Sequence, residues 1–128
     1  MTPKRVVVVD DEPDIRDLVV LLLQHDPRCA TVAAAGGVSE AMQVVRQVLP
    51  DVVLIDLFLG RQLCVEILPD MRALLPRAHL VVYTASSRAA RAAGVIEAGA
   101  DRIIEKGADA IDAVLDAVLA IATTGDRA

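Results

Sequence analysis

The chain has 128 residues, of which 55% are hydrophobic, and this is enough to bury the core of one ordinary domain without disulfide bonds or structural metals. Its formal net charge of −5, its single Phe and its single Tyr exclude a nucleic-acid interface built from clustered basic residues or stacked aromatics. No apolar stretch approaches the ~20 residues that cross a bilayer. We therefore expect a cytoplasmic domain that contacts neither nucleic acid nor membrane.

Short apolar runs rich in β-branched residues recur along the chain and predict strands. They are mostly continuous rather than alternating, which is typical of parallel strands that are covered on both faces. The predicted strands span residues 5–9, 29–33, 52–57, 80–84 and 102–104.

A helical pattern follows the first predicted strand. Ile15, Leu18, Val19 and Leu22 have the spacing of a single apolar helix face. Pro13 suits the first turn, where its missing N–H costs nothing. We expect this face to pack on the sheet.

Four further helices are expected between and after the remaining strands. Ser39 is expected to cap the second helix, because its hydroxyl can accept a hydrogen bond from a free backbone N–H of the first turn. The predicted ranges are 39–48, 64–75, 87–98 and 109–122. Five strands alternating with five helices predict a three-layer α/β sandwich with a parallel sheet. Residues 1–122 would form the domain, and 123–128 a tail or the start of a linker.

Polar residues gather where the predicted strands end. Asp10 and Asp11 follow the first strand, Asp56 ends the third, Thr84 ends the fourth, and Lys106 follows the fifth. Ligands of open parallel sheets bind beyond the carboxyl ends of the strands. We therefore expect three acids, a hydroxyl and an ammonium to converge on one edge.

This set of side chains suggests phosphoryl transfer. Three neighbouring carboxylates repel one another, and an oxygen-only ligand set favours a hard ion such as Mg²⁺. A magnesium ion, a lysine and a hydroxyl around one aspartate would hold a transferring phosphoryl group and neutralise its charge. Asp56 would then be the nucleophile that forms an aspartyl phosphate.

Four segments together resemble the receiver domain of two-component response regulators. They are VVVVDDEPDIRDLV, PDVVLIDL, VVYTA and GADRIIEKG, and the resemblance extends over residues 5–122. It implies a flavodoxin-like fold with strand order 2-1-3-4-5. It also implies that Asp56 is the phosphoacceptor, that the Thr84 hydroxyl follows the phosphoryl group, and that the Lys106 ammonium contacts it.

The same resemblance implies a magnesium site and a set of partners. Asp10, Asp11 and Asp56 would hold Mg²⁺ together with the main-chain carbonyl of Phe58. A sensor histidine kinase or a phosphotransfer protein would supply the phosphoryl group. The domain would be a signalling phosphoacceptor rather than an enzyme, assisting only its own phosphorylation and dephosphorylation. A homodimer through the fourth and fifth helices would fit the family.

Three departures from the family lie in the loops around the site. The loop after Asp56 has Leu59-Gly60 in place of Met-Pro and Leu63-Cys64 in place of Asp-Gly. We expect the glycine to loosen this loop, and the loss of the later glycine to remove an easy position for positive φ. Gly107 replaces the usual proline after the lysine, and we expect a trans peptide or a strained turn there.

The fourth departure concerns the conformational switch. Ile103 stands where receivers usually have an aromatic that swings inward as the hydroxyl moves. We therefore predict that aromatic rotation is not the readout. The segment from Ala85 to Arg88 and the fourth helix, which contains Gly94, are the expected mobile elements.

Alternatives remain open at this point. The departures allow a degenerate receiver that binds a partner independently of phosphorylation. An aspartate-nucleophile phosphatase would need a second acid at Phe58, and a cobalamin-binding module would need a histidine there. The predicted fifth helix has an apolar face wider than a surface helix needs, so it is either well buried or a contact surface. That face consists of Ile111, Val114, Leu115, Val118, Leu119 and Ile121.

Overall fold

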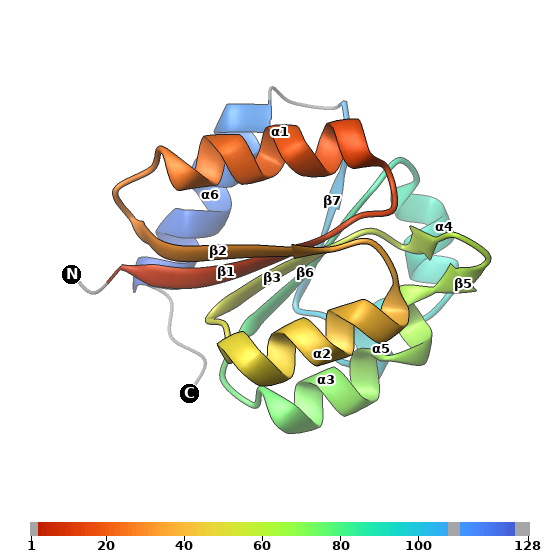
Figure 1. The fold of residues 1–128 in the computed structure, drawn as a ribbon. Helices are drawn as coiled ribbons and strands as arrows, with labels where there is room; N and C mark the ends of the chain where they lie inside the picture. Colours follow the sequence, from red (N-terminus) through yellow and green to blue (C-terminus); the bar gives the residue numbers. More distant parts are fainter. Residues whose placement is uncertain (1–2, 108–110, 125–128) are drawn as a thin grey trace.

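The computed structural model describes residues 3–107 and 111–124, with side chains up to residue 120. Five parallel strands form one sheet in the order β2-β1-β3-β6-β7 (Figure 1), which confirms the predicted order 2-1-3-4-5. The strands are β1 Lys4–Val9, β2 Cys29–Ala35, β3 Val52–Ile55, β6 His79–Thr84 and β7 Arg102–Glu105. All of the predicted strands are present, with shifted ends.

Helices cover both faces of this sheet. The helices α1 and α6 lie on one face, and α2, α3 and α5 lie on the other (Figure 1). Their bounds are α1 Pro13–Gln24, α2 Val38–Val48, α3 Leu68–Leu74, α4 Ser87–Ala92, α5 Val95–Ala98 and α6 Ile111–Thr124, with a 3-10 turn, η1, at Cys64–Glu66. None of the described helices has the length and apolar character needed to cross a bilayer.

The valine run of β1 is buried on both sides of the sheet. Val6 and Val8 pack into the core beneath α1 and α6, whereas Val7 and Val9 pack into the core beneath α2 and α3. Each fully buried valine stabilises the fold by roughly 1.5–3 kcal/mol relative to an exposed one. This two-sided burial explains why the run is continuous rather than alternating.

The helix predictions need correction at several residues. The α2 helix starts at Val38 with Gly37 at its N-cap, so the prediction that Ser39 caps it is wrong. In α1, Val19 and Leu23 are the buried residues, while Leu18 is 42% exposed, so the apolar face is rotated from the predicted one. The predicted fourth helix is divided into α4 and α5, because Gly94 adopts the left-handed conformation with φ 78°.

The predicted apolar face of the last helix is packed against the core over its described side chains, with Ile111 partly buried. Four residues of α6 are at most 5% exposed and pack into the core between the sheet and the helices α1 and α6. They are Val114, Leu115, Val118 and Leu119. The helix ends at Thr124 instead of residue 122. Its predicted start at residue 109 and the side chain of the predicted face residue 121 lie outside the described part of the chain.

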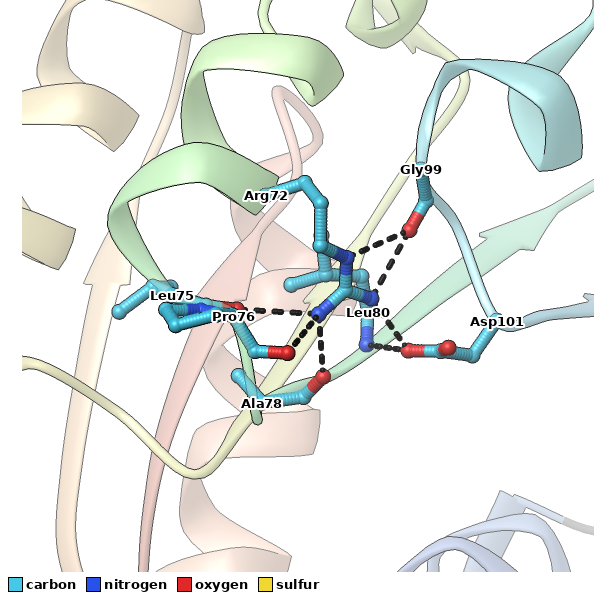
Figure 2. A network of polar contacts seen from close by, with 7 residues as sticks. All are labelled: Arg72, Leu75, Pro76, Ala78, Leu80, Gly99 and Asp101. Atoms are coloured by element: carbon cyan, nitrogen blue, oxygen red, sulfur yellow. Dashed lines mark hydrogen bonds and ion pairs between the residues drawn. The ribbon is translucent and has the colours of Figure 1, made fainter. Parts of the chain in front are cut away.

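A network around Arg72 fixes the edge of the sheet where β6 and β7 begin (Figure 2). The Arg72 guanidinium donates to the carbonyl of Gly99 at 2.9 and 3.1 Å, to that of Ala78 at 2.8 Å, and to Asp101 Oδ2 at 2.6 Å. The same Asp101 oxygen accepts from the Leu80 N–H at 2.8 Å. One arginine of α3 therefore ties together the loops that enter both strands.

Candidate functional site

The five predicted polar residues lie at the carboxyl ends of the strands, at the opposite end of the sheet from the Arg72 network. Asp10 and Asp11 follow β1, Asp56 follows β3, Thr84 ends β6, and Lys106 follows β7. These four strands are neighbours and run parallel, so their carboxyl ends emerge side by side (Figure 1). The topology thus brings together side chains that are up to 96 positions apart in the chain.

Three carboxylates form a cluster of oxygen donors. Asp10, Asp11 and Asp56 each offer an oxygen, and these oxygens lie within 4.8 Å of one another. Asp10 is only 4% exposed, the Asp56 side chain is largely buried and Asp11 is exposed. Hard divalent cations prefer such oxygen ligands, and no softer ligand belongs to the set. The donor set therefore fits Mg²⁺.

Lys106 neutralises part of this charge. Its Nζ donates to Asp56 Oδ2 at 2.7 Å and to Asp10 Oδ2 at 2.9 Å. Burial alone would lower the pKa of Lys106, but the hydrogen bonds and the attraction of both carboxylates outweigh it, so its pKa is raised. The same Nζ lies 5.5 Å from the ring centroid of Tyr83. At neutral pH the ammonium is therefore charged and bridges two of the three acids.

Thr84 contributes a hydroxyl without a partner. It is fully buried at the end of β6, and within the described residues its Oγ1 makes no hydrogen bond. A buried polar group left in this state costs about 1–3 kcal/mol. The backbone around it is held in place, since the Lys106 N–H donates to the Thr84 carbonyl at 2.7 Å. The end of β6 thus holds a buried hydroxyl without a partner, and its role toward a phosphoryl group stays a prediction.

The loop after Asp56 has a structure that the sequence did not predict. β4 Phe58–Leu59 and β5 Gln62–Leu63 form a short antiparallel hairpin. Gly60 adopts φ 64° in its turn, and its N–H donates to Asp11 Oδ2 at 2.9 Å. This glycine supplies the positive φ of the turn and its N–H binds an acid of the site, whereas the expectation that it loosens the loop stays a prediction. A glycine four residues after the strand-end Asp56 was the available signal.

The structure also shows the conformation or burial of Gly107, Ile103 and Phe58. Every described peptide bond is trans, including Lys106–Gly107, and Gly107 adopts φ 81°. Ile103 is partly buried against the core beneath α2 and α3. Phe58 has a side chain that is 50% exposed, and the role of its carbonyl as a metal ligand stays a prediction.

Arg16 belongs to the site although no sequence pattern pointed to it. Its Nη1 donates to the main-chain carbonyl of Asp10 at 3.0 Å. Arginines on exposed helices are common, so only the folded structure shows that this one reaches back to the strand end.

Comparison with known proteins agrees with this geometry. A family model described as the response regulator receiver domain matches residues 6–118. The chain is 33% identical over 99 residues, 77% of its length, to a protein-glutamate methylesterase/protein-glutamine glutaminase of Rhizobium etli, of which it spans only 28%. It is 32% identical over 119 residues to the nitrate/nitrite response regulator protein NarP of Escherichia coli, covering 93% of this chain and 55% of that protein.

A solved structure shows the same fold over nearly the whole chain. The signal receiver domain of the response regulator NarL from Mycobacterium tuberculosis superposes with a TM-score of 0.82 and 26% identity. The superposition covers 97% of this chain and 99% of that one. With the family model matching most of its length, the chain belongs to the response regulator receiver domains of two-component signalling.

Proposed function

We propose that Asp56 accepts a phosphoryl group from a histidine kinase or a phosphotransfer protein in a magnesium-dependent reaction. The observation that carries the proposal is the environment of the Asp56 carboxylate. Its side chain is only 12% exposed and lies beside Asp10 and Asp11, with the Lys106 ammonium at 2.7 Å from Asp56 Oδ2. The unpartnered hydroxyl of Thr84 lies at the same edge of the sheet.

The chemistry follows from these residues. A carboxylate oxygen of Asp56 attacks phosphorus, the P–N bond of the donor phosphohistidine breaks, and the imidazole leaves with the bonding electrons. Lys106 then neutralises charge on the phosphoryl oxygens, and the Thr84 hydroxyl donates a hydrogen bond to one of them. Asp10, Asp11, Asp56 and the Phe58 carbonyl would hold Mg²⁺. The bound ion would stabilise the negative charge that spreads over the phosphoryl oxygens.

We expect a signalling module that catalyses only its own phosphorylation and dephosphorylation. The relative from Rhizobium etli is named a protein-glutamate methylesterase/protein-glutamine glutaminase, but this chain spans 28% of that protein, and the site described here is a cluster of three aspartates. The activity in that name is therefore no part of the function proposed for this chain.

Phosphate incorporation tests the proposal. The protein is incubated with acetyl phosphate and Mg²⁺, and intact-mass spectrometry counts the phosphoryl groups. We expect one group on the wild type, and none on Asp56→Asn or after chelation of Mg²⁺. Asp70→Asn, which changes an exposed aspartate on α3, is the matched control and should be labelled like the wild type. Full labelling of Asp56→Asn would overturn the assignment.

A degenerate receiver is the second candidate. Lys106 bridges Asp10 and Asp56, and Ile103 stands where receivers usually have the switch aromatic. In that case, amide NMR spectra would not change on addition of Mg²⁺ or acetyl phosphate. Shifts around Thr84 would exclude this candidate.

A homodimer through α4, α5 and α6 stays a proposal. Arg88 and Arg91 of α4 and Asp112 of α6 are exposed and carry opposite charges, so two copies could pair them reciprocally. Sedimentation with and without acetyl phosphate tests this. A monomer in both conditions would contradict it.

A further inference from the structure

We propose that Arg16 is a positioning residue for the magnesium site, and that Gly36 lacks a side chain in order to leave room for its guanidinium. This inference rests on the proposed function, because it concerns how the acids that would hold Mg²⁺ are oriented.

Arg16 acts on the peptide group that joins two of those acids. The carbonyl that accepts its Nη1 hydrogen bond at 3.0 Å belongs to the Asp10–Asp11 peptide. The direction of this peptide plane determines how both side chains leave the backbone. A donor fixed on the carbonyl therefore orients Asp10 and Asp11 together.

All other polar groups of Asp10 are also held. Its N–H donates to the Ala35 carbonyl at 3.1 Å. Its Oδ1 accepts from the Glu12 N–H at 2.9 Å, and its Oδ2 from Lys106 at 2.9 Å. The bond from Arg16 completes this set and is the only one made by a side chain of α1 among the described contacts of Asp10. Arg16 is therefore the contact through which α1 holds the acid.

Gly36 lies directly against this guanidinium. A Cβ at position 36 would lie 2.8 Å from Arg16 Nη1, closer than such atoms can approach. The backbone does not require glycine here, because Gly36 is absent from the positive-φ glycines. Its N–H is held by Glu40 Oε1 at 2.6 Å. The space that a side chain would fill is thus the space that Arg16 occupies.

This contact permits a selective perturbation. The atom that an added methyl group meets is the end of a flexible side chain, so Gly36→Ala should displace the guanidinium without changing any charge or unfolding the domain. Gly37→Ala is the matched control, since a Cβ there meets nothing within 4 Å. Both substitutions are made in the wild type and in Arg16→Met.

Calorimetric titration with Mg²⁺ alone measures the effect. We expect Gly36→Ala to weaken the Kd for Mg²⁺ about tenfold, as loss of an outer contact to a metal ligand commonly does. Gly37→Ala should stay within about twofold of the wild type. In the Arg16→Met background Gly36→Ala should have almost no further effect, because the group it displaces is gone. Because Gly36→Ala is compared within each background, this double-mutant cycle also removes the direct effect of the lost Arg16 charge on the Kd.

Three results would overturn the inference. Gly36→Ala could bind Mg²⁺ like the wild type, it could weaken binding equally in both backgrounds, or Gly37→Ala could weaken it as much. Failure of the wild type to bind Mg²⁺ at all would instead refute the proposed magnesium site, and this inference with it. Urea unfolding of each variant verifies that all of them are folded during the titration.

Discussion

At the scale of single residues, the site combines one satisfied charge and one unsatisfied hydroxyl. Lys106 is hydrogen-bonded to two carboxylates, whereas the buried Thr84 Oγ1 has no partner among the described residues. The first arrangement stabilises the fold in the absence of ligand, and the second destabilises it. The two residues therefore predict opposite effects on stability when their polar groups are removed.

Thr84→Val should stabilise the protein. The substitution keeps the shape of the side chain and removes a buried hydroxyl that has no partner, so we expect the free energy of unfolding to rise by about 1 kcal/mol. Thr84→Ser, which keeps the hydroxyl, should not gain this stability. Urea unfolding measures both. A loss of stability in Thr84→Val would show that the hydroxyl is hydrogen-bonded in solution.

Lys106→Met should destabilise the protein in a pH-dependent way. It leaves two carboxylates without a counter-charge, and we expect a loss of about 2 kcal/mol. The pKa of Lys106 is raised in the folded state, so its stabilising contribution is fully present below the ordinary lysine pKa of 10.5 and is lost as pH rises through the raised value. The difference in unfolding free energy between wild type and variant should be constant from about pH 6 to pH 9 and shrink above ~pH 10.5. A difference that already shrinks below pH 9 would contradict the raised pKa.

At the scale of elements, strands were easier to predict than helices and loops. The run from Val6 to Val9 is buried on both faces, so apolar continuity alone located β1. Helix starts depend on individual caps, and Gly37 rather than Ser39 occupies the cap of α2. The β4–β5 hairpin depends on one glycine conformation at Gly60, which no periodic pattern reveals.

Gly60→Ala should destabilise the hairpin. A left-handed φ costs a residue with a Cβ roughly 1 kcal/mol or more, and the Gly60 N–H must keep its position to reach Asp11. Gly60→Asn is the control, because asparagine tolerates this conformation better. We expect Gly60→Ala to unfold at lower urea concentration than Gly60→Asn. Equal midpoints would mean that the turn adopts another conformation in solution.

At the scale of the whole molecule, the two ends of the parallel strands differ in function: one end carries the candidate site and the other carries a network that stabilises the fold. The carboxyl ends of the strands hold the acids, the lysine and the hydroxyl, while the Arg72 network fixes the entries of β6 and β7 (Figure 2). The sequence predicted the first edge, because strand ends can be read from apolar runs and parallel strands share an edge. It did not predict the Arg72 network, because a single arginine in a sequence does not indicate which main-chain carbonyls will accept its hydrogen bonds.

Arg72→Met should separate stability from binding. It leaves the carbonyls of Gly99 and Ala78 and the Asp101 carboxylate without their shared donor, so we expect a loss of about 3 kcal/mol in urea unfolding. Because the network lies at the edge remote from Asp56, the Kd for Mg²⁺ at a temperature where the variant is folded should match that of the wild type. A large change in that Kd would show that the two edges are coupled.

The central claim is that Asp56 is the residue that carries the phosphoryl group. Borohydride reduction converts an aspartyl phosphate into homoserine, and peptide mass spectrometry then locates the converted residue. After incubation with acetyl phosphate and Mg²⁺, we predict homoserine at position 56 and intact aspartate at positions 10 and 11. Conversion at Asp10 or Asp11, or no conversion at any aspartate, would contradict the claim.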